Sequence, residues 1–593
     1  DTVVKIENAS NEFLKNINLS LKAGEIVGIA GLQGSGRTEL SQALFGEIPF
    51  KKGTISINGH IETIQSPAHA IKLNMGFVTE DRKAQGIFPN QPIRDNILVT
   101  VRALQKLWVR ISPNGIRKNP NLVPTLGKQV DIRASSYDQE VNSLSGGNQQ
   151  KVILAKWLAP NTEVMIFDEP TRGIDVDAKA SIHKMIRDLA KNGAAIMMVS
   201  SELPEIIGMS DRIVVMCDGE IAGELPAKSS EADIMLMATG YENGEPVQVE
   251  DHRQDKETFA EKTQKAAISG FGNFKNRFAM LRIPPVYYML IVLFIVGLIM
   301  DSIFGRGQMS DPSILMNILV RSVALGIVAI GQTMVMIGAS IDLSVAYLIS
   351  VTAVMSSFIM QGDPAKVPLA VAIVFGIGAL VGLVNGLIIT KFKVNAFIAT
   401  MGVGLILRGG LSASFSNFTG AVPESFQTFG YGKIGPIPIS VLILLFSVIL
   451  GSIVLFRTKY GAHLYGVGGN EDVARLSGLR TDRVIIISHI ISSLTAVLAG
   501  LFIVSRLRAG APWIGTDGVY DLESIAAVVV GGTALAGGSG NITGSLAGVI
   551  IFGVLDTVFN QVGLDTFLKS VLRGSVIILA VASYTIRSKR EAS

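Results

Sequence analysis

The sequence predicts two kinds of fold in one chain: an α/β domain, then an all-α domain that crosses a membrane about ten times. In residues 1–240, short apolar runs such as 26–30 and 164–167 alternate with helical patterns, which is typical of α/β domains. From Pro285 to the end, long apolar runs dominate. Residues 241–284 between them are polar with charges of both signs, so we expect a solvated linker.

The composition of the whole chain supports the membrane domain and excludes several classes of protein. Of 593 residues, 48% are hydrophobic and 17% charged, against roughly 25% charged in a soluble chain. These values exclude a wholly soluble, a disordered or a coiled-coil protein. The single cysteine, Cys217, can form no intrachain disulfide. The net charge of +4 is too small for this length to suggest nucleic-acid binding.

Ten apolar stretches are candidate spans, most of them reaching the roughly 17–25 residues that cross a membrane. They are residues 286–304, 313–338, 343–361, 367–390, 395–413, 438–456, 485–505, 523–537, 541–558 and 566–586. The eighth is short, so we expect a short or re-entrant segment there. No N-terminal apolar run suggests a signal peptide. With residues 1–240 in the cytoplasm, basic residues concentrate in the inside loops, and ten spans return the C-terminus to the cytoplasm.

The first motif that carries chemistry is a glycine-rich loop between a strand and a helix. Residues 31–38 (GLQGSGRT) fit G-x-x-x-x-G-K-[ST], except that Arg37 stands in the lysine position. In such a loop, successive backbone N–H groups wrap phosphate oxygens, and the hydroxyl of Thr38 is placed to hold Mg²⁺. The backbone donors belong to Gly31, Gly34, Ser35 and Gly36. Taken alone, a glycine loop is also compatible with an ordinary turn.

Two further motifs follow in order. The segment LSGGNQQ at 144–150 opens an amphipathic helix with free N–H groups that can face a phosphate. Its candidate binding residues are Ser145, Gly146 and Gly147. The apolar strand 164–167 then ends in Asp168, placed to hold Mg²⁺ through water, and Glu169, placed to polarise an attacking water. Each motif alone has a structural explanation, but the three in this order indicate nucleotide hydrolysis.

This set of motifs resembles the ATP-binding cassette (ABC) ATPases. In that family, ATP lies between two cassettes, with the glycine loop of one facing the LSGG-type signature of the other. The resemblance implies ATP and Mg²⁺ as cofactors, and an α/β P-loop core with a helical subdomain around residues 82–160. It makes Glu169 the catalytic residue and places Asp175, in the segment TRGID, in the loop that links the cassettes.

Three positions depart from the family pattern. Arg37 replaces the lysine, Glu80 stands where a hinge glutamine is usual, and Ser201 replaces the switch histidine. With LSGGNQQ, TRGID and SSELPE, these changes resemble the second cassette of monosaccharide-importer ATPases. The resemblance implies a site that binds nucleotide but hydrolyses it poorly. It also implies a first-type cassette as partner, either on a longer polypeptide of which residues from Asp1 onward are the C-terminal part, or on a separate subunit. A pair of identical chains is the alternative.

The membrane half resembles the ribose/galactose-type sugar permeases over nearly all of residues 285–590. The resemblance rests on four segments in order: IDLSVA (341–346), GLVNGLIITKFKVNAFIAT (382–400), YGVGGNEDVARLSGL (465–479) and DLESIAAVVVGGTALAGGSG (521–540). It implies that a short charged helix in 470–478 docks on a cassette and transmits its closure; a solvated loop is the alternative. The candidate coupling residues are Glu471, Asp472 and Arg475. The candidate transport-pathway residues are Asp342, for which helix capping is the alternative, Asn395 and Glu523.

The resemblances together imply ATP-dependent import of a monosaccharide, most simply a ribose-like one, across a bacterial inner membrane. The implied partners are a sugar-binding protein outside the membrane, a first-type cassette, a second permease copy and the surrounding lipid, with no nucleic acid. The alternative is a non-transporting membrane protein whose altered cassette senses nucleotide. An exporter is disfavoured because its spans usually precede the cassette.

Overall fold

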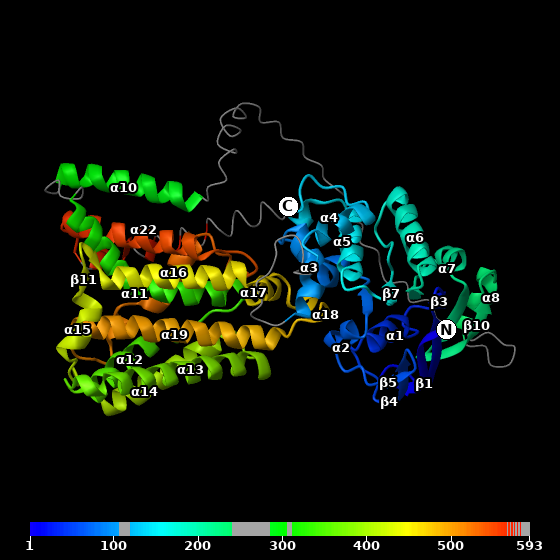
Figure 1. The fold of residues 1–593 in the computed structure, drawn as a ribbon, viewed down its shortest axis with the longest axis horizontal. Coiled ribbons are helices and arrows are strands. Elements are labelled where there is room, and N and C mark those ends of the chain that lie inside the picture. Colours follow the sequence, from blue (N-terminus) through cyan, green and yellow to red (C-terminus); the bar gives the residue numbers. More distant parts are fainter. Residues whose placement is uncertain are drawn as a thin grey trace.

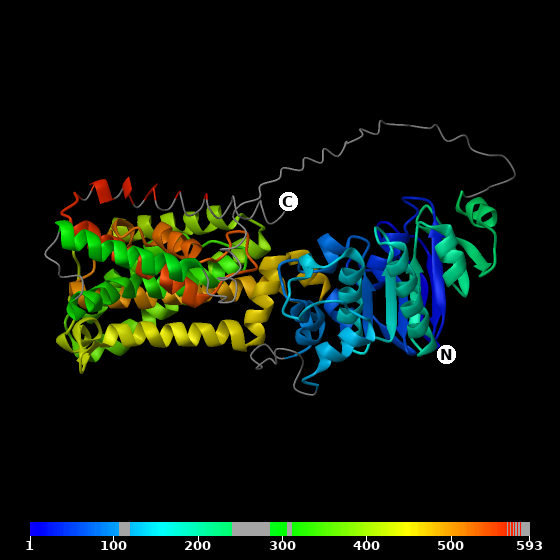
Figure 2. The same cartoon turned by 90° about the horizontal axis from the view of Figure 1, so that it is seen from above.

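The computed structural model describes residues 1–105, 119–239, 285–304 and 311–565, with scattered residues between 567 and 582. The expected linker 241–284 lies outside the described residues, as does most of the tenth expected span, 566–586. An α/β part stands at one end of an elongated molecule and a helix bundle at the other (Figure 1). The two meet at α17 (Lys459–Gly469) and α18 (Glu471–Leu476), and the view from above also places these helices between the two parts (Figure 2).

The α/β part is built on a six-stranded sheet in the order β10-β9-β3-β8-β7-β6. Its strands are β3 (Ile26–Gly31), β6 (Met75–Val78), β7 (Val164–Asp168), β8 (Ala195–Val199), β9 (Arg212–Cys217) and β10 (Glu220–Pro226). All neighbours pair in parallel except β9 and β10. Strands β6, β7 and β8 are buried along their whole length, because helices cover parallel sheets on both faces. The helices of this core are α1 (Arg37–Leu44), α2 (Pro67–Lys72), α6 (Val176–Lys191), α7 (Leu203–Met209) and α8 (Glu231–Ala238).

A second, antiparallel sheet and a helical layer complete this part. The sheet has the order β2-β1-β4-β5, with β1 (Thr2–Ser10), β2 (Ile17–Lys22), β4 (Lys52–Ile57) and β5 (His60–Glu62). The helical layer comprises η1 (Arg82–Gly86), α3 (Ile93–Ala103), α4 (Leu122–Gln129), η2 (Val141–Ser143) and α5 (Gly146–Leu158). It lies between the six-stranded sheet and the bundle (Figure 1), so the expected helical subdomain faces the membrane half.

The bundle is organised around α19 (Thr481–Leu507), which packs against α11 (Pro312–Ile337), α12 (Val345–Met360) and α13 (Val367–Lys391). The other long helices are α10 (Pro285–Phe304), α14 (Ala396–Ser414), α16 (Ile439–Arg457) and α22 (Ile542–Gln561). Within the described ranges, six helices are long and apolar enough to cross a membrane, and α10 and α12 contain shorter apolar helices. Eight of the ten expected spans therefore correspond to one helix each, and the predicted fold class is confirmed.

Short elements close the end of the bundle that lies away from the α/β part, which we call the distal end (Figure 1). They are η3 (Pro364–Lys366), α15 (Glu424–Tyr431), β11 (Lys433–Ile434), β12 (Ile437–Pro438) and α20 (Ile514–Asp517). Phe426 and Phe429 of α15 lie against each other with tilted rings, and Phe429 also contacts Phe502 of α19. These aromatic side chains therefore cover the distal end of the helices.

The eighth expected span is an 11-residue helix, α21 (Tyr520–Val530), followed by an irregular segment to residue 541. Glycines make this possible because neighbouring backbones come very close. A β-carbon on Gly548 of α22 would lie 2.0 Å from the Ala527 carbonyl oxygen of α21. In the irregular segment, Gly538 has φ +74° and its N–H donates to the Ile337 carbonyl at 2.9 Å. The segment thereby returns the chain to the bundle end nearest the α/β part, which we call the cassette end.

The close approach of α21 and α22 predicts that alanine substitutions at two glycines, one on α22 and one on α13, have different effects on stability. Gly548→Ala should lower the thermal unfolding midpoint in detergent, because overpacking of this kind costs about 1–3 kcal/mol. Gly376→Ala on α13 is the matched control: a β-carbon there meets nothing within 4 Å, so its midpoint should stay unchanged or rise slightly. Equal midpoints for the two variants would contradict the packing of α21 on α22.

Candidate functional site

The glycine-rich loop lies between β3 and α1, at the carboxyl end of a central parallel strand. Gly34 and Gly36 adopt φ +83° and +100°, so the chain turns tightly and directs its N–H groups to one side. A β-carbon on Gly34 would meet nothing within 4 Å, so this side of the loop is open. Ser35 is 5% exposed, and its hydroxyl has no hydrogen-bond partner among the described residues. The loop therefore has the form of a phosphate cradle.

Arg37, the first residue of α1, points toward the strand that ends at the switch position. Its Nη1 donates to the carbonyl oxygen of Ser200 at 2.9 Å. Ser201, the residue in the switch position, follows directly. The guanidinium thus joins the glycine loop to the switch, and a phosphate in the loop would compete with the Ser200 carbonyl for it.

Asp168 is the last residue of β7 and is 1% exposed. Burial raises the pKa of its carboxyl to about 7; nearby Glu80 and Glu169 add to this, while the Thr38 hydroxyl and Arg37 oppose it. Within the described part of the chain, neither carboxylate oxygen has a hydrogen-bond partner. A buried carboxylate with only the Thr38 hydroxyl nearby as a donor fits a divalent cation. Because the described residues hold no cluster of three or more His, Cys, Asp or Glu, Mg²⁺ here needs nucleotide oxygens and water besides Asp168 and Thr38.

Glu169 has an unusual backbone conformation, with φ +50°. Its N–H donates to the Val199 carbonyl at 2.9 Å, and its Oε1 accepts from the Ser201 N–H at 2.6 Å. Burial raises the pKa of the Glu169 carboxyl, and the Ser201 hydrogen bonds partly offset this. Left-handed backbone in a residue with a side chain persists only where its surroundings hold it, and it gathers at functional sites.

Glu80, in the hinge position after β6, forms an ion pair with Arg172 of the TRGID segment. Arg82 donates to the carbonyls of Arg172 and Gly173, at 3.3 and 3.4 Å. Asp175 caps α6, because its Oδ1 accepts from the Ala178 N–H at 2.9 Å. The hinge and the segment expected to link two cassettes are therefore tied to each other.

The signature residues stand at the start of α5. Ser145 is the N-cap, and its hydroxyl accepts from Asn148 Nδ2 at 3.0 Å. A β-carbon on Gly146 would lie 2.8 Å from the Arg82 guanidinium, and one on Gly147 would lie 2.6 Å from the Ala178 side chain. Across the described residues, no hydrogen bond or ion pair joins 145–147 to the glycine loop of the same chain.

A buried network beside the switch was not predicted from the sequence. Glu205 of α7 is 5% exposed and accepts from Thr171 Oγ1 at 2.7 Å, from Ser200 Oγ at 2.5 Å and from the His183 ring at 2.5 Å. Burial alone would raise the pKa of Glu205, but these hydrogen bonds hold it below its usual value. The network fixes the turn that carries Ser201. The only signal in the sequence was the segment SSELPE, in which Glu205 lies in the first turn of the helix that follows two serines.

The helix expected to couple the two parts, α18, lies against α2 and η1 of the α/β part. Its Val473, Ala474 and Leu476 are buried, whereas Glu471 and Asp472 are exposed. Arg475 Nη2 lies 3.7 Å from Glu47 Oε1, and Asn470 Nδ2 donates to the Ala84 carbonyl at 2.9 Å. Burial raises the pKa of Glu47, with Arg475 opposing and Asp472 adding to the shift. Phe88 packs into the same apolar cluster as Val473 and Ala474.

The three candidate pathway residues do not come together. Asp342 is fully buried between α11 and α12, where its Oδ1 accepts from the Ser344 N–H at 3.0 Å and hydroxyl at 2.6 Å. Asn395 is exposed and caps α14 by accepting from the Phe397 N–H at 2.9 Å. Glu523 is half-buried in the first turn of α21. Asn395 is thus the N-cap of α14, and Asp342 accepts from the residue that caps α12.

Comparison with known proteins agrees with this arrangement. Residues 14–172 match the ABC transporter family, and residues 314–581 match the permease component of the branched-chain amino acid transport system. The chain therefore carries a segment of ABC transporter ATPase type and a segment of permease type on one polypeptide. Its cassette segment is similar to ribose import ATP-binding proteins.

The ribose import ATP-binding protein RbsA of Lactococcus lactis subsp. cremoris is 45% identical over 241 residues, which are 40% of this chain and 48% of that protein. RbsA of Bacillus subtilis is 43% identical over 245 residues, with the same two coverages. The chain thus spans about half the length of the curated relatives it matches. A solved nucleotide-free ATP-binding cassette from an ABC transporter matches 38% of this chain and 92% of its own, with 18% identity and a TM-score of 0.34.

The buried Asp168 predicts a specific pH dependence of stability. Because its folded pKa is about 7, against about 3.9 in an unfolded chain, the folded protein without nucleotide keeps a proton that the unfolded chain releases. Stability should therefore fall as pH rises from 5 to 7, by about 1.4 kcal/mol per unit from this group. Asp168→Asn should flatten the decline in unfolding midpoint and abolish the extra stabilisation that Mg²⁺ gives with nucleotide. Asp188→Asn, on the exposed face of α6, should leave both unchanged; the same slope in all three proteins would contradict the assignment.

The contact of α18 with the cassette predicts that apolar packing, not the ion pair, holds it. Burying a valine stabilises by about 1.5–3 kcal/mol, whereas an ion pair as exposed as Arg475–Glu47 contributes about 0–1 kcal/mol. Val473→Asp should increase hydrogen exchange in residues 67–72 and 82–86, and Arg475→Gln should leave it close to wild type. A larger increase with Arg475→Gln would reverse this order.

Proposed function

We propose that the chain is the ATP-driven and membrane-spanning half of an importer that moves a ribose-like monosaccharide across a bacterial inner membrane. The observation that carries the proposal is the buried contact of α18 with a cassette whose relatives are ribose import ATP-binding proteins. A permease-family domain on the same polypeptide supports a transported substrate rather than nucleotide sensing alone. The regulatory alternative would leave this contact without a role.

We further propose that this chain's own nucleotide site binds ATP with Mg²⁺ but hydrolyses it weakly. Three residues support this: Arg37 is engaged by the Ser200 carbonyl, the Ser201 side chain is too short for the reach of a histidine, and Glu169 is held by the Ser201 N–H. In a competent site, Glu169 would orient and deprotonate the attacking water. Ser145, Gly146 and Gly147, which contact no glycine loop of their own chain, are free to complete the site of a first-type cassette.

The remaining partners follow from the two ends of the bundle. At the distal end, Phe418 and Trp513 form an edge-to-face pair with ring centroids 5.7 Å apart, and they are 61% and 37% exposed. An exposed aromatic pair of this kind supports docking of a sugar-binding protein. We propose that the cassette (residues 1–240) and the C-terminus are cytoplasmic, that residues 241–284 link the cassette to the permease domain (285–593), and that two permease copies form the pathway.

If the chain's own nucleotide site hydrolyses ATP weakly, removing its catalytic carboxylate should change the hydrolysis rate only a little. ATP hydrolysis by the purified chain alone should be slow, and Glu169→Gln should reduce it far less than the roughly 10²–10⁴-fold that loss of a general base costs a competent site. ATP binding, measured by equilibrium titration, should be retained in both proteins. Fast turnover that Glu169→Gln abolishes would overturn the partner-dependent site.

Transport itself is tested in proteoliposomes. With a first-type cassette and a ribose-binding protein added, labelled ribose should accumulate only when ATP is present on the cassette side. Val473→Asp should abolish accumulation while ATP binding remains. ATP turnover without uptake of any sugar from a panel of binding proteins would favour the regulatory alternative.

A further inference from the structure

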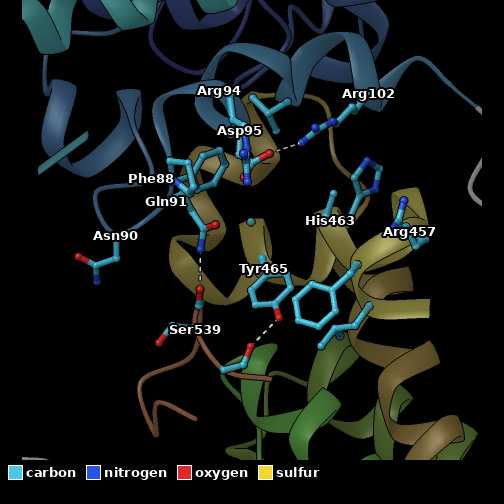
Figure 3. Close-up of a pocket in the computed structure, with 18 residues that line it drawn as sticks. Phe88, Asn90, Gln91, Arg94, Asp95, Arg102, Arg457, His463, Tyr465 and Ser539 are labelled. Carbon is cyan, nitrogen blue, oxygen red and sulfur yellow. Dashed lines mark hydrogen bonds and ion pairs between the residues drawn. The ribbon is translucent and has the colours of Figure 1, made fainter. Parts of the chain in front are cut away.

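A cavity of about 500 Å³ lies where the cassette meets the permease domain (Figure 3). One wall comes from the loop before α3 and from α3 itself, including Phe88, Arg94 and Arg102. The facing wall comes from the end of α16, from α17 and from the glycine segment 538–540. One hydrogen bond joins the two walls: Gln91 Nε2 donates to the Gly538 carbonyl at 2.5 Å. A second lies within the permease wall, where the Tyr465 hydroxyl donates to the Gly540 carbonyl at 2.6 Å (Figure 3).

The lining carries an excess of positive charge. Three arginines line the cavity, Arg94, Arg102 and Arg457, against one aspartate, Asp95. Arg102 pairs with Asp95 at 2.6 Å, and Arg94 pairs with Asp138. Arg457 is exposed and forms no ion pair with any carboxylate of the described residues. The cavity therefore offers one guanidinium to an anion from outside, and a guanidinium suits phosphate because its donors form a planar fork.

His463 adds a second, different requirement. It is 6% exposed, its ring donates to the backbone carbonyl of Arg102, and its Nε2 has no hydrogen-bond partner among the described residues. Burial, together with the nearby Lys459 and Arg102, lowers the pKa of His463 to about 3. The ring is therefore neutral at physiological pH, and its second nitrogen is an acceptor that needs a donor. A hydroxyl supplies that donor, whereas a bare phosphate dianion does not.

The third feature is the position of the cavity at the end of a membrane span. Leu455, Phe456 and Arg457 are the last residues of α16, and all three line the cavity. Phe456 is 50% exposed. Basic pockets at the ends of membrane helices suit anionic headgroups whose apolar parts stay in the bilayer. A soluble ligand with the same polar chemistry can enter by the same opening.

We propose that this cavity binds the phosphate ester of a polyol, with the phosphate on Arg457 and a hydroxyl on His463 Nε2. Both of these contacts belong to the permease domain, and the facing wall with Phe88 and Arg94 belongs to the cassette, so the occupant lies between the two parts. This site lies apart from the nucleotide site and is independent of which sugar is transported. The ligand chemistry has two sources, the headgroup of phosphatidylglycerol and a soluble polyol phosphate such as glycerol 3-phosphate.

The test compares the full chain with two single variants in nanodiscs. Arg457→Gln removes the proposed phosphate contact, and Lys393→Gln, an exposed cation at the cassette end of α13 that does not line the cavity, is the matched control. Native mass spectrometry reports retained phosphatidylglycerol, and the unfolding midpoint in phosphatidylcholine discs reports glycerol 3-phosphate and inorganic phosphate. Arg457→Gln should weaken binding of one of the two polyol phosphates on the order of tenfold, and Lys393→Gln should not.

Each outcome decides the proposal or its source. A change confined to phosphatidylglycerol retention identifies the lipid, and a change confined to glycerol 3-phosphate, which should bind tighter than inorganic phosphate, identifies the soluble ligand. Ala462→Phe, which fills the cavity and keeps every arginine, should lower binding in the same way while ATP binding shows that the protein is folded. Equal losses in Arg457→Gln and Lys393→Gln, or no loss in Arg457→Gln and Ala462→Phe, would overturn the proposal.

Discussion

The contact between α18 and the cassette is the interaction on which the rest of the structure depends. It is small and mainly apolar: Val473, Ala474 and Leu476 on one side, Phe88 and the residues of α2 on the other. After a short turn, the chain enters α19, the helix at the centre of the bundle. α18 is therefore connected to α19 through covalent structure, and α19 to α11, α12 and α13 through packing. Because packed interiors deform little, these helices form one connected unit.

The part of the cassette that contacts α18 includes η1, which begins shortly after the hinge position at Glu80. η1 begins at Arg82, whose guanidinium donates to the TRGID carbonyls, and Glu80 just before it pairs with Arg172. The same Arg82 stands beside Gly146 of the signature. The nucleotide-side residues and the permease contact are thus separated by one short π-helical segment. This explains why a few polar contacts near residue 82 connect the hinge, the signature and the cassette-linking loop.

Much of this arrangement could be predicted from the sequence, for physical reasons that also mark the limits. The buried parallel strands and the long membrane helices carry periodicity and length signals that a single chain displays, so the fold class and eight of the spans were predictable. The antiparallel sheet of β1, β2, β4 and β5 was not predicted, because its strands are interrupted by exposed residues and lack the continuous buried apolar runs of β6, β7 and β8. A short or re-entrant segment was anticipated at the eighth apolar stretch because that stretch is too short to cross a membrane.

Side-chain partners were harder to predict, because they depend on which residues the fold brings together. Glu205 receives hydrogen bonds from Thr171, His183 and Ser200, residues between 5 and 34 positions away in sequence. Arg37 stands in the lysine position of the glycine-rich loop, and its partner in this structure is a backbone carbonyl, which no sequence pattern reports. Asp342 keeps both interpretations, because it accepts hydrogen bonds from Ser344 before α12 and also lies 3.9 Å from His489.

The surroundings of Asp342 explain how α11, α12, α13 and α19 are held together at the cassette end. His489 of α19 contacts Ser340 at 2.9 Å and lies 3.9 Å from Asp342, while Asn385 of α13 donates to Ser344 at 2.9 Å. The irregular turn between α11 and α12 is therefore fixed by polar side chains of α13 and α19, not by a regular helix. Polar contacts in a water-poor interior are costly to break singly and can be exchanged as a set. Since α19 follows closely after α18, the helix that holds the turn between α11 and α12 is covalently continuous with the helix that contacts the cassette. A shift of α19 would therefore either carry the turn with it or exchange its hydrogen bonds.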